Sequence, residues 1–320
     1  MRLLAEIHGY PPHHNSGAEW MAHHVFRYMA QQGHEVVILL NFESYLGKVD
    51  KPYEFEGVKV VNDKEWRIYY AWCDIVFTHL DKTGKAYNRA KLFKRPLVHF
   101  IHNDYKNVVV ENMNGISQHA IYNANWVRDA VKDRQKYISR SIVVHPPVYV
   151  DDYKVKRIND YITLINLNPN KGGDFLQKLA KRMPDRKFMG VMGSYGHQLM
   201  DVKIKNIHYL ENTGDIKKVY KRTRILLMPS IYESYGRTAI EACSSGIPVI
   251  CNSTPGLRES LGKSGIYCNR ENIEEWVKAI ENLDDINNYN LFSKLSLERA
   301  KEVNPEKELI NLEKWLYDTN

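Results

Sequence analysis

The sequence predicts an α/β protein with two domains, each built on a parallel sheet. Short apolar runs rich in Val, Ile and Leu alternate with helical stretches along the chain, and this alternation starts afresh near residue 161. The length of 320 residues also exceeds the size at which one hydrophobic core usually stops growing. We therefore expect two α/β domains with ligands at the carboxyl ends of their strands.

The first domain opens with a βαβ unit. An apolar strand is expected at residues 3–7, followed by a loop rich in Gly, Pro and His. A helix is expected over residues 18–32, because apolar residues recur at helical spacing from Met21 to Met29 and Gly33 supplies a stop. Further strands are expected at residues 36–40, 75–78, 97–101 and 142–144.

The second domain follows a turn-rich and polar stretch that ends at residue 160. We expect a first domain of residues 1–150, a second of residues 151–304, and a C-terminal helix in residues 305–320 that can cross back to the first. Strands of the second domain are expected at residues 161–167, 187–192, 207–210, 225–228 and 248–251. Helical sequence between them indicates parallel strands joined by crossovers.

Composition narrows the class of partner and the compartment. The excess of Lys and Arg gives a net charge of +7, which favours an anionic partner such as a sugar nucleotide, a membrane surface or a nucleic acid. No apolar stretch approaches the roughly 18 residues of a membrane span, and the first residues lack the apolar run of a signal peptide. The four cysteines include no CxxC pair. We expect a cytoplasmic protein with reduced, buried thiols.

The most informative segment follows the strand expected to end at residue 228 and reads PSIYESYGRTAIEA. It leads into a helix, where the backbone N–H groups of Gly236, Arg237 and Thr238 can point at a diphosphate. Glu233 precedes this anion site and Glu241 lies just over one helical turn beyond Arg237. We assign Glu233 to the hydroxyls of a sugar and Glu241 to those of a ribose. Two glutamates alone would be read as surface acids; the surrounding residues favour the site.

This segment, with GIPVIC and PGLRE after it, resembles the retaining glycosyltransferases of family 4, the glycosyl transferases group 1. The resemblance covers most of the chain. It implies the GT-B fold, in which two Rossmann-like domains present parallel sheets to a central cleft. It also implies a hexosyltransferase whose N-terminal domain binds the acceptor and whose C-terminal domain binds a UDP- or GDP-linked sugar.

In the first domain the resemblance marks the residues before the first helix and a histidine after a strand. The segment Ser16-Gly17-Ala18-Glu19 stands where the family has a Gly-Gly-x-Glu loop against the donor diphosphate, with Ser16 in place of the first glycine. His102 matches the histidine beside the reacting sugar, and Asn103 is a weaker neighbouring candidate. The other histidines near the start either serve the acceptor or lie in a solvated loop; they are His8, His13 and His14.

In the second domain the resemblance marks a cation for the donor phosphates. Lys171 aligns with the lysine of a Gly-Arg-x4-Lys-Gly segment, whereas the customary arginine is Asn166 here. One of the family's two positive charges on the leaving group is therefore missing, and Arg237 is a candidate to compensate. Tyr235, beside the expected phosphate-binding turn, is a further donor-binding candidate.

The expected catalytic residues are Glu233, His102 and Lys171. Transfer requires stabilising the charge that grows on the departing diphosphate while an acceptor hydroxyl attacks the anomeric carbon. Enzymes of the other common glycosyltransferase fold hold a metal with Asp-x-Asp, and no two aspartates in this chain stand two residues apart. We expect no metal and no cofactor. The resemblance implies retention of anomeric configuration.

The acceptor stays open at this point. A run of six bases without an acid precedes His102, namely Lys82, Lys85, Arg89, Lys91, Lys94 and Arg95. It is either a solvated helix or a contact for anionic lipid, with peripheral membrane association, or for a phosphodiester backbone. A saccharide or lipid-linked glycan is the favoured acceptor. The alternatives are hydroxymethylated bases of DNA or, in another class, a non-catalytic nucleotide- or nucleic-acid-binding protein. A nicotinamide dehydrogenase is disfavoured because the first loop lacks Gly-x-Gly-x-x-Gly.

Overall fold

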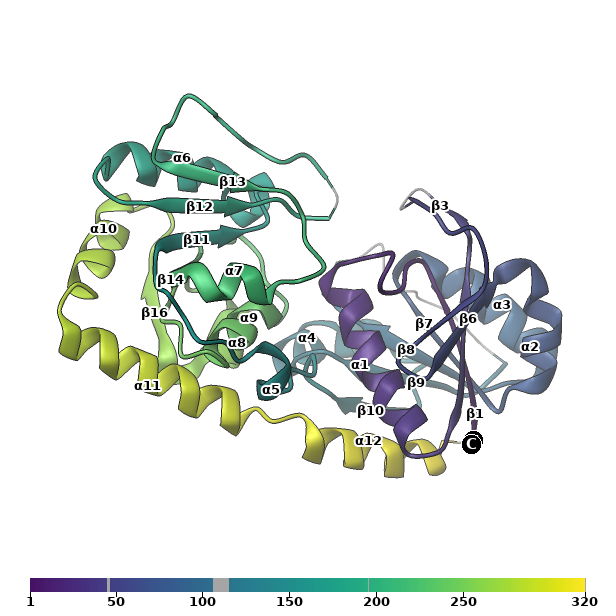
Figure 1. Ribbon diagram of the computed structural model, residues 1–320. Helices are drawn as coiled ribbons and strands as arrows, with labels where there is room; N and C mark the ends of the chain where they lie inside the picture. The colour runs from purple at the N-terminus through teal and green to yellow at the C-terminus, as the bar shows by residue number, and fades with distance from the viewer. Residues whose placement is uncertain (45–46, 106–114, 195, 320) are drawn as a thin grey trace. The chain divides into compact units, whose positions relative to one another are not determined.

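The computed structural model describes residues 1–44, 47–105, 115–194 and 196–319 (Figure 1). The chain forms two compact units, the first of Met1–Pro147 with Pro305–Asn320 and the second of Val148–Asn304. The sequence predicts boundaries after residues 150 and 304. Each unit contains a predominantly parallel sheet with helices, so the predicted α/β class with two parallel-sheet domains is confirmed.

The first unit is built on a sheet with the order β10-β9-β8-β7-β1-β2-β6-β5 in the described residues. All neighbours are parallel except β5, which runs antiparallel to β6 at the edge. The sheet extends in both directions from β1, with β2, β6 and β5 on one side and β7, β8, β9 and β10 on the other. The chain therefore crosses from one side of β1 to the other between β6 and β7. The strands are β1 (Arg2–Ile7), β2 (Glu35–Leu40), β5 (Tyr53–Phe55), β6 (Val58–Asn62), β7 (Ile75–His79), β8 (Leu97–Ile101), β9 (Gln118–Tyr122) and β10 (Arg140–Val143), with a small hairpin of β3 (Glu43–Ser44) and β4 (Gly47–Lys48).

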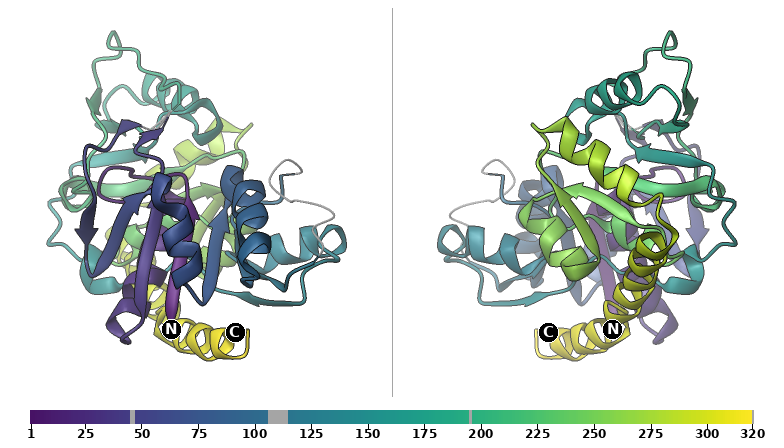
Figure 2. Two further views of the ribbon diagram at one scale, coloured as in Figure 1. Left: turned by 90° about the vertical axis from the view of Figure 1, so that its right-hand side faces the viewer. Right: turned by 90° about the vertical axis from the view of Figure 1, so that its left-hand side faces the viewer.

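Helices cover both faces of this sheet (Figure 2). Alternate residues of a strand point to opposite faces, so Val76 packs with the buried residues of α2 and α3 while Phe77 meets Phe26 of α1 edge-on. The last helix, α12, packs on α1 and is held by a hydrogen bond from His34 to Glu313. The helices are α1 (Gly17–Gln31), α2 (Trp66–Trp72), α3 (Thr83–Phe93), α4 (Asn125–Val131) and α12 (Glu306–Tyr317), with 3-10 turns η1 (Asp63–Glu65), η2 (Leu80–Lys82) and η3 (Lys132–Arg134).

The second unit has an entirely parallel sheet with the order β13-β12-β11-β14-β15-β16 in the described residues. Numbered along the unit, this is the order 3-2-1-4-5-6 of the Rossmann fold, whose strand order reverses between β11 and β14. The first strand ends at Ile165, earlier than predicted, because Asn166 turns the chain with a φ of 76°. The strands are β11 (Tyr161–Ile165), β12 (Phe188–Val191), β13 (Ile207–Leu210), β14 (Thr223–Met228), β15 (Val249–Asn252) and β16 (Gly265–Cys268).

The core of this unit lies between the sheet and two of its helices. Phe175 of α6 and Trp276 of α10 pack against each other, with ring centroids 4.8 Å apart, over the buried side chains of β11, β12 and β14. The four cysteines of the chain are buried and unpaired, as expected for reduced thiols. The helices are α5 (Val150–Tyr153), α6 (Gly173–Arg182), α7 (Lys217–Arg222), α8 (Arg237–Cys243), α9 (Pro255–Leu261), α10 (Ile273–Asn282) and α11 (Ile286–Glu302), with 3-10 turns η4 (Pro169–Lys171) and η5 (Gly262–Ser264).

Candidate active site

The strand-order reversal of the second unit brings Lys171 and Glu233 together. Strands β11 and β14 are parallel neighbours, so the loops that leave their carboxyl ends lie side by side. Lys171 Nζ donates to Glu233 Oε1 at 2.6 Å, and Ser230 Oγ donates to the same oxygen at 2.8 Å. The two residues are 62 positions apart in sequence. An acid and a base therefore share the edge where open α/β sheets place their ligands.

Local hydrogen bonds shape the turn that carries Lys171. The side chain of Asn168 accepts from the backbone N–H of Asn170 and so caps the 3-10 turn η4, while Gly172 ends it in the left-handed region. Asn166, at the position where the family resemblance would place an arginine, accepts from the N–H of Asn168 at 3.1 Å. An asparagine suits this position because its short polar side chain tolerates a positive φ. Asn166 thus shapes the turn and brings no charge.

Arg270, which the sequence analysis did not single out, ties the Lys171 turn to the Glu233 loop. Its guanidinium donates to the carbonyl of Pro229 at 2.6 Å and to that of Pro169 at 3.1 Å, and it pairs with Asp174 at 3.2 Å. Its side chain is only 11% exposed. Its position just after strand β16 could have marked it as a candidate from the sequence. An arginine that follows a strand does not, however, reveal from sequence which groups it contacts.

A glycine lets α9 approach the loop that carries Glu233. A Cβ atom added at Gly256 would lie 2.2 Å from the carbonyl oxygen of Glu233 and 2.6 Å from the carbonyl carbon of Ser234. No side chain fits there without moving that backbone. Gly236, the residue before α8, has a φ of 87°, which favours glycine. These two glycines let α9 pack against the loop that connects Glu233 to the predicted backbone donors of Gly236 to Thr238.

Glu241 and Arg237 form a buried pair within the second unit. Glu241 is 5% exposed, and its two carboxylate oxygens accept from Arg237 and from the hydroxyl of Tyr220, each at 2.7 Å. Arg237 also donates to the hydroxyl of Tyr153. Burial, opposed in part by the Arg237 charge, raises the pKa of Tyr153 to about 12. Arg237, predicted as a compensating cation for the donor diphosphate, is therefore paired with Glu241. Tyr235, the other donor-binding candidate of this segment, is buried.

In the first unit, three histidines lie at the carboxyl ends of three neighbouring strands. His8 follows β1, His79 ends β7 and His102 follows β8, and the sheet order places β7 between the other two. His79 Nδ1 and His102 Nε2 are 3.0 Å apart, and the rings of His8 and His79 have centroids 4.6 Å apart. Burial lowers the pKa of His102 to about 4, against the partial opposition of Glu19. His79 was missed, although it carries the same strand-end signal as His102.

The predicted Ser16-Gly17 segment lies at the start of α1 and joins this histidine cluster through Glu19. Gly17 is the first residue of α1, and Ser16 Oγ donates to the carboxylate of Glu19. His8 Nε2 lies 2.9 Å from the other oxygen of Glu19. Burial alone would raise the pKa of Glu19, but the hydrogen bond and charge of His8 outweigh it and lower that pKa. Glu19 thus connects the predicted phosphate loop to the strand-end histidines.

The other candidates near the start of the chain have local partners. His14 is buried and its Nδ1 accepts from the backbone N–H of Tyr10 at 3.0 Å, so its contacts are structural. His13 is exposed and its ring meets that of Tyr53 edge-on. Asn103 accepts from the N–H of Tyr105 at 3.1 Å.

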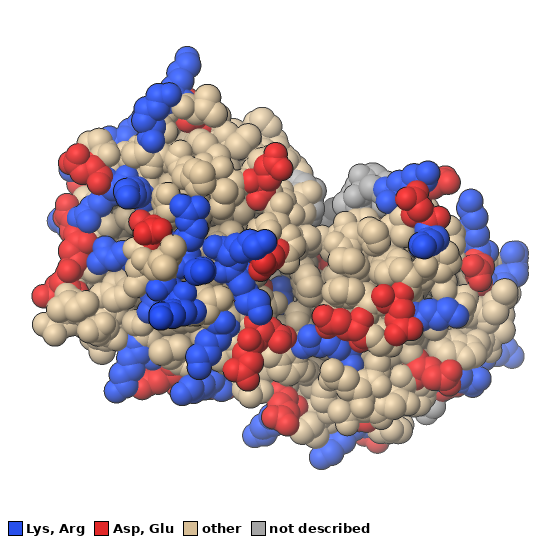
Figure 3. Space-filling model, in the orientation of Figure 1, with Lys and Arg blue, Asp and Glu red and all other residues tan. Residues whose placement is uncertain are grey.

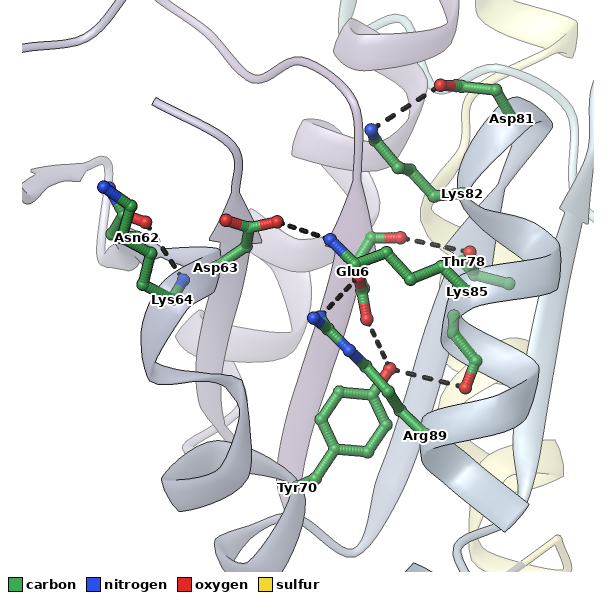
Figure 4. A network of polar contacts seen from close by, with 11 residues as sticks. Glu6, Asn62, Asp63, Lys64, Tyr70, Thr78, Asp81, Lys82, Lys85 and Arg89 are labelled. Carbon is green, nitrogen blue, oxygen red and sulfur yellow. Dashed lines mark hydrogen bonds and ion pairs between the residues drawn. The ribbon is translucent and has the colours of Figure 1, made fainter. Parts of the chain in front are cut away.

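Half of the basic run before His102 is paired with acids of its own unit. Figure 4 shows three of its members on α3 or next to it, each facing an acid. The pairs are Lys82 with Asp81 at 3.6 Å, Lys85 with Asp63 at 2.7 Å and Arg89 with Glu6 at 2.7 Å. Arg95 donates to two backbone carbonyls. The face of the first unit seen in Figure 3 likewise shows acids interspersed with bases, whereas Lys and Arg gather more densely on the second unit. The other three members, Lys91, Lys94 and Arg95, form no ion pair with a described acid, so part of the run's charge stays available to an anionic acceptor.

The described part of the chain holds no group of three or more His, Cys, Asp or Glu side chains arranged to bind a metal ion. Within the same residues, no helix is both long and apolar enough to span a bilayer.

The chain is similar in sequence to known glycosyltransferases over part of its length. Residues 160–285 match the family of glycosyl transferases group 1. The O-antigen chain mannosyltransferase RfbU of Salmonella typhimurium is 29% identical over 96 residues, which are 29% of this chain and 27% of that protein. A D-inositol 3-phosphate glycosyltransferase of Paenarthrobacter aurescens is 29% identical over 125 residues, 33% of this chain and 30% of that protein. The alignments thus span less than a third of the length of these two curated relatives.

Solved structures resemble the chain over its whole length. A sucrose-phosphate synthase of Thermosynechococcus elongatus matches with a TM-score of 0.80 at 14% identity, covering 99% of this chain and 98% of that one. HepE of Anabaena, solved in complex with UDP and glucose, matches with a TM-score of 0.76 at 15% identity, covering 100% and 99%. The chain has the GT-B fold, as the sequence predicted.

Proposed function

We propose that the chain is a glycosyltransferase that takes a hexose from a nucleotide diphosphate sugar and transfers it to an acceptor hydroxyl. One observation carries the proposal: Lys171 and Glu233 meet at the strand-order reversal of the sheet that matches glycosyl transferases group 1. The solved complexes of HepE with UDP and glucose and with UDP-glucose support a UDP-linked donor. A GDP-linked donor is the alternative.

The two oxygens of Glu233 suit two different partners. Lys171 and Ser230 both donate to Oε1, whereas Oε2 accepts no hydrogen bond from any described residue. We infer that Oε2 accepts a hydroxyl of the donor sugar. The side chain of Glu233 is 11% exposed, so such a bond forms with little competition from water.

Lys171 can serve the leaving group while it holds Glu233. An ammonium group has three N–H donors, of which Glu233 takes one, and the others can meet the oxygens of a diphosphate. Charge grows on these oxygens as the bond to the anomeric carbon breaks, so a cation here binds the transition state better than the ground state. The backbone N–H groups at the start of α8 add to this stabilisation in the proposal.

The remaining parts of the proposal concern stereochemistry, metal and acceptor. We propose retention of anomeric configuration, because the residues around Glu233 resemble the retaining enzymes of family 4. Metal independence is proposed because the chain lacks Asp-x-Asp. The acceptor is proposed to be a saccharide or lipid-linked glycan, in keeping with the O-antigen mannosyltransferase among the relatives. A nucleic-acid acceptor is less favoured because three of the six bases before His102 are paired with acids of their own unit.

The test is a donor screen followed by product analysis. UDP- and GDP-linked hexoses would be incubated with the purified chain in EDTA, and the release of UDP or GDP would be measured with and without simple saccharide acceptors. The proposal expects release from one nucleotide class, stimulated by an acceptor, and a product with the donor's anomeric configuration by NMR. No release from any donor, even with Mg²⁺ or Mn²⁺ restored, would overturn the activity. Release only with metal would overturn metal independence alone.

A further inference from the structure

The strand-end histidines form a chain of contacts that ends on His102. His79 is fully buried between the other two rings, with its Nδ1 facing His102 Nε2 at 3.0 Å. The ring of His8 lies against its other side at an interplanar angle of 32°. His8 itself is held between Glu19 at 2.9 Å and Asp81 at 3.3 Å. The position of His79 is therefore determined by its neighbours and not by solvent.

The two imidazoles share one hydrogen bond, so only one of the two facing nitrogens, His79 Nδ1 or His102 Nε2, carries a proton. Burial lowers the pKa of His79 well below its usual value and lowers that of His102 to about 4. Both rings are then neutral at neutral pH, and each carries a single N–H. Two nitrogens 3.0 Å apart need one donor and one acceptor, so the two tautomers are coupled.

The surroundings of His79 decide which ring donates. Its Nε2 is buried and has no hydrogen-bond partner among the described residues. If His102 donated, His79 would have to carry its proton on Nε2 and bury an unsatisfied N–H. If His79 donates from Nδ1, its Nε2 is a bare nitrogen, and an unsatisfied acceptor is tolerated more readily than an unsatisfied N–H.

We propose that His79 is a positioning residue that donates its Nδ1 proton to Nε2 of His102 and so fixes His102 as the Nδ1–H tautomer. The proposal rests on the proposed function and on the family resemblance, which implies that His102 lies beside the donor sugar. Both nitrogens of His102 are then assigned: Nε2 accepts from His79, and Nδ1 offers a hydrogen bond to an oxygen of the sugar. With no lone pair left for a proton, His102 acts as a neutral donor and not as a general base.

The backbone of His102 is fixed from another direction. Its carbonyl accepts from Asn123 Nδ2 at 3.0 Å. Its ring lies parallel to that of Phe100, with an interplanar angle of 11°. Because the main chain and one ring face are held independently of His79, loss of the His79 hydrogen bond should change the tautomer of His102 more than its place.

The test compares two substitutions of His79 in the full chain. His79→Asn keeps an N–H near the position of Nδ1, whereas His79→Leu removes it. His99→Leu is the matched control, because His99 is also a buried histidine of this sheet whose ring bonds a single side chain, Gln118, at 3.0 Å. Chains labelled with ¹⁵N-histidine would give the tautomer of His102 by NMR, with His102→Gln used to assign its signals. Release of UDP or GDP from the preferred donor would give kcat and KM.

We expect His102 to be protonated on Nδ1 in the unsubstituted chain and in His79→Asn, and to become a mixture of tautomers in His79→Leu. The kcat of His79→Leu should fall about tenfold or more with a smaller change in donor KM, while His79→Asn and His99→Leu retain most activity. An Nε2–H signal for His102 in the unsubstituted chain would overturn the proposal. Equal kcat losses in His79→Leu and His99→Leu would also overturn it.

The spectra keep this test separate from the proposed function. If no donor is turned over, the proposed function fails, yet the tautomer of His102 still decides whether His79 donates. Should His79→Leu fail to fold, the unsubstituted chain and His79→Asn still report the tautomer, and an Nε2–H signal in either would contradict the assignment.

Discussion

Replacing Arg270 by glutamine should loosen the connection between the Lys171 turn and the Glu233 loop. The guanidinium bonds one carbonyl on each of these segments, Pro169 at 3.1 Å and Pro229 at 2.6 Å. The shorter, neutral glutamine cannot reach both carbonyls. Lys171 and Glu233 would then lose a common anchor, although their own ion pair remains.

The magnitude follows from the two hydrogen bonds. Each joins a charged donor to a backbone carbonyl, and such bonds contribute about 1.5–3 kcal/mol. We take the lower end, because a carbonyl at the edge of the sheet can bind water once the arginine is gone. The loss in unfolding free energy is then about 3 kcal/mol. The pair with Asp174 adds little, since that carboxylate is 41% exposed.

The assay must separate loss of stability from loss of positioning. Arg224 is a matched control, because it lies at the other end of strand β14 and also bonds a carbonyl, Leu283 at 2.7 Å, and an acid, Asp284 at 3.1 Å. Both glutamine variants should unfold at lower urea concentration. Only Arg270→Gln should raise the donor KM, by about tenfold, because small displacements of binding groups are costly. An unchanged donor KM in a folded Arg270→Gln chain would refute this reasoning.

Three other changes test the described geometry. Arg237→Met or Glu241→Gln alone should cost about 3–5 kcal/mol in urea unfolding because a buried charge loses its partner; the double variant should cost less than the sum, and additive losses would contradict a coupled pair. Gly256→Ala should raise the donor KM about tenfold or more, since its Cβ would lie 2.2 Å from the carbonyl oxygen of Glu233; an unchanged KM would argue against this contact. Burial, opposed by the hydrogen bond that His99 donates to Gln118, lowers the pKa of His99 to about 4, below its unfolded value. The stability present above pH ~6.5 is therefore lost as the pH falls towards 4, by up to about 1.4 kcal/mol per pH unit. Unfolding of His99→Leu should depend less on pH in that range, and an identical pH profile would count against it.

The fold could be predicted because it depends on periodic, local signals. Apolar runs restart at Tyr161, and each is followed by sequence with helical spacing. This alternation predicts a second parallel sheet even when no contact between residues is known. The end of β11 was placed two residues too late, because Leu167 is apolar and buried although the chain has already turned at Asn166. Apolar periodicity records burial and does not report a local positive φ.

The candidate site was only partly predictable, because its residues meet through tertiary contacts. Lys171 and Glu233 were both selected, but their direct ion pair depends on the neighbouring positions of β11 and β14 in the sheet. The same limit explains why Arg270 and His79 were missed: each ends or follows a strand, and its partner lies on another element. Strand order, which sequence periodicity does not give, supplies this information.

The most direct test of the proposed donor site is the rate of nucleotide diphosphate release by Glu233→Gln. This substitution keeps the size of the side chain and its contacts with Lys171 and Ser230, but removes the negative charge. Release of UDP or GDP from the preferred sugar nucleotide would be followed in EDTA beside the unsubstituted chain and the Arg224→Gln control. We predict a loss of about 100-fold or more for Glu233→Gln and little change for Arg224→Gln. Equal rates in Glu233→Gln and the unsubstituted chain would contradict the assignment of Glu233 to the reacting sugar.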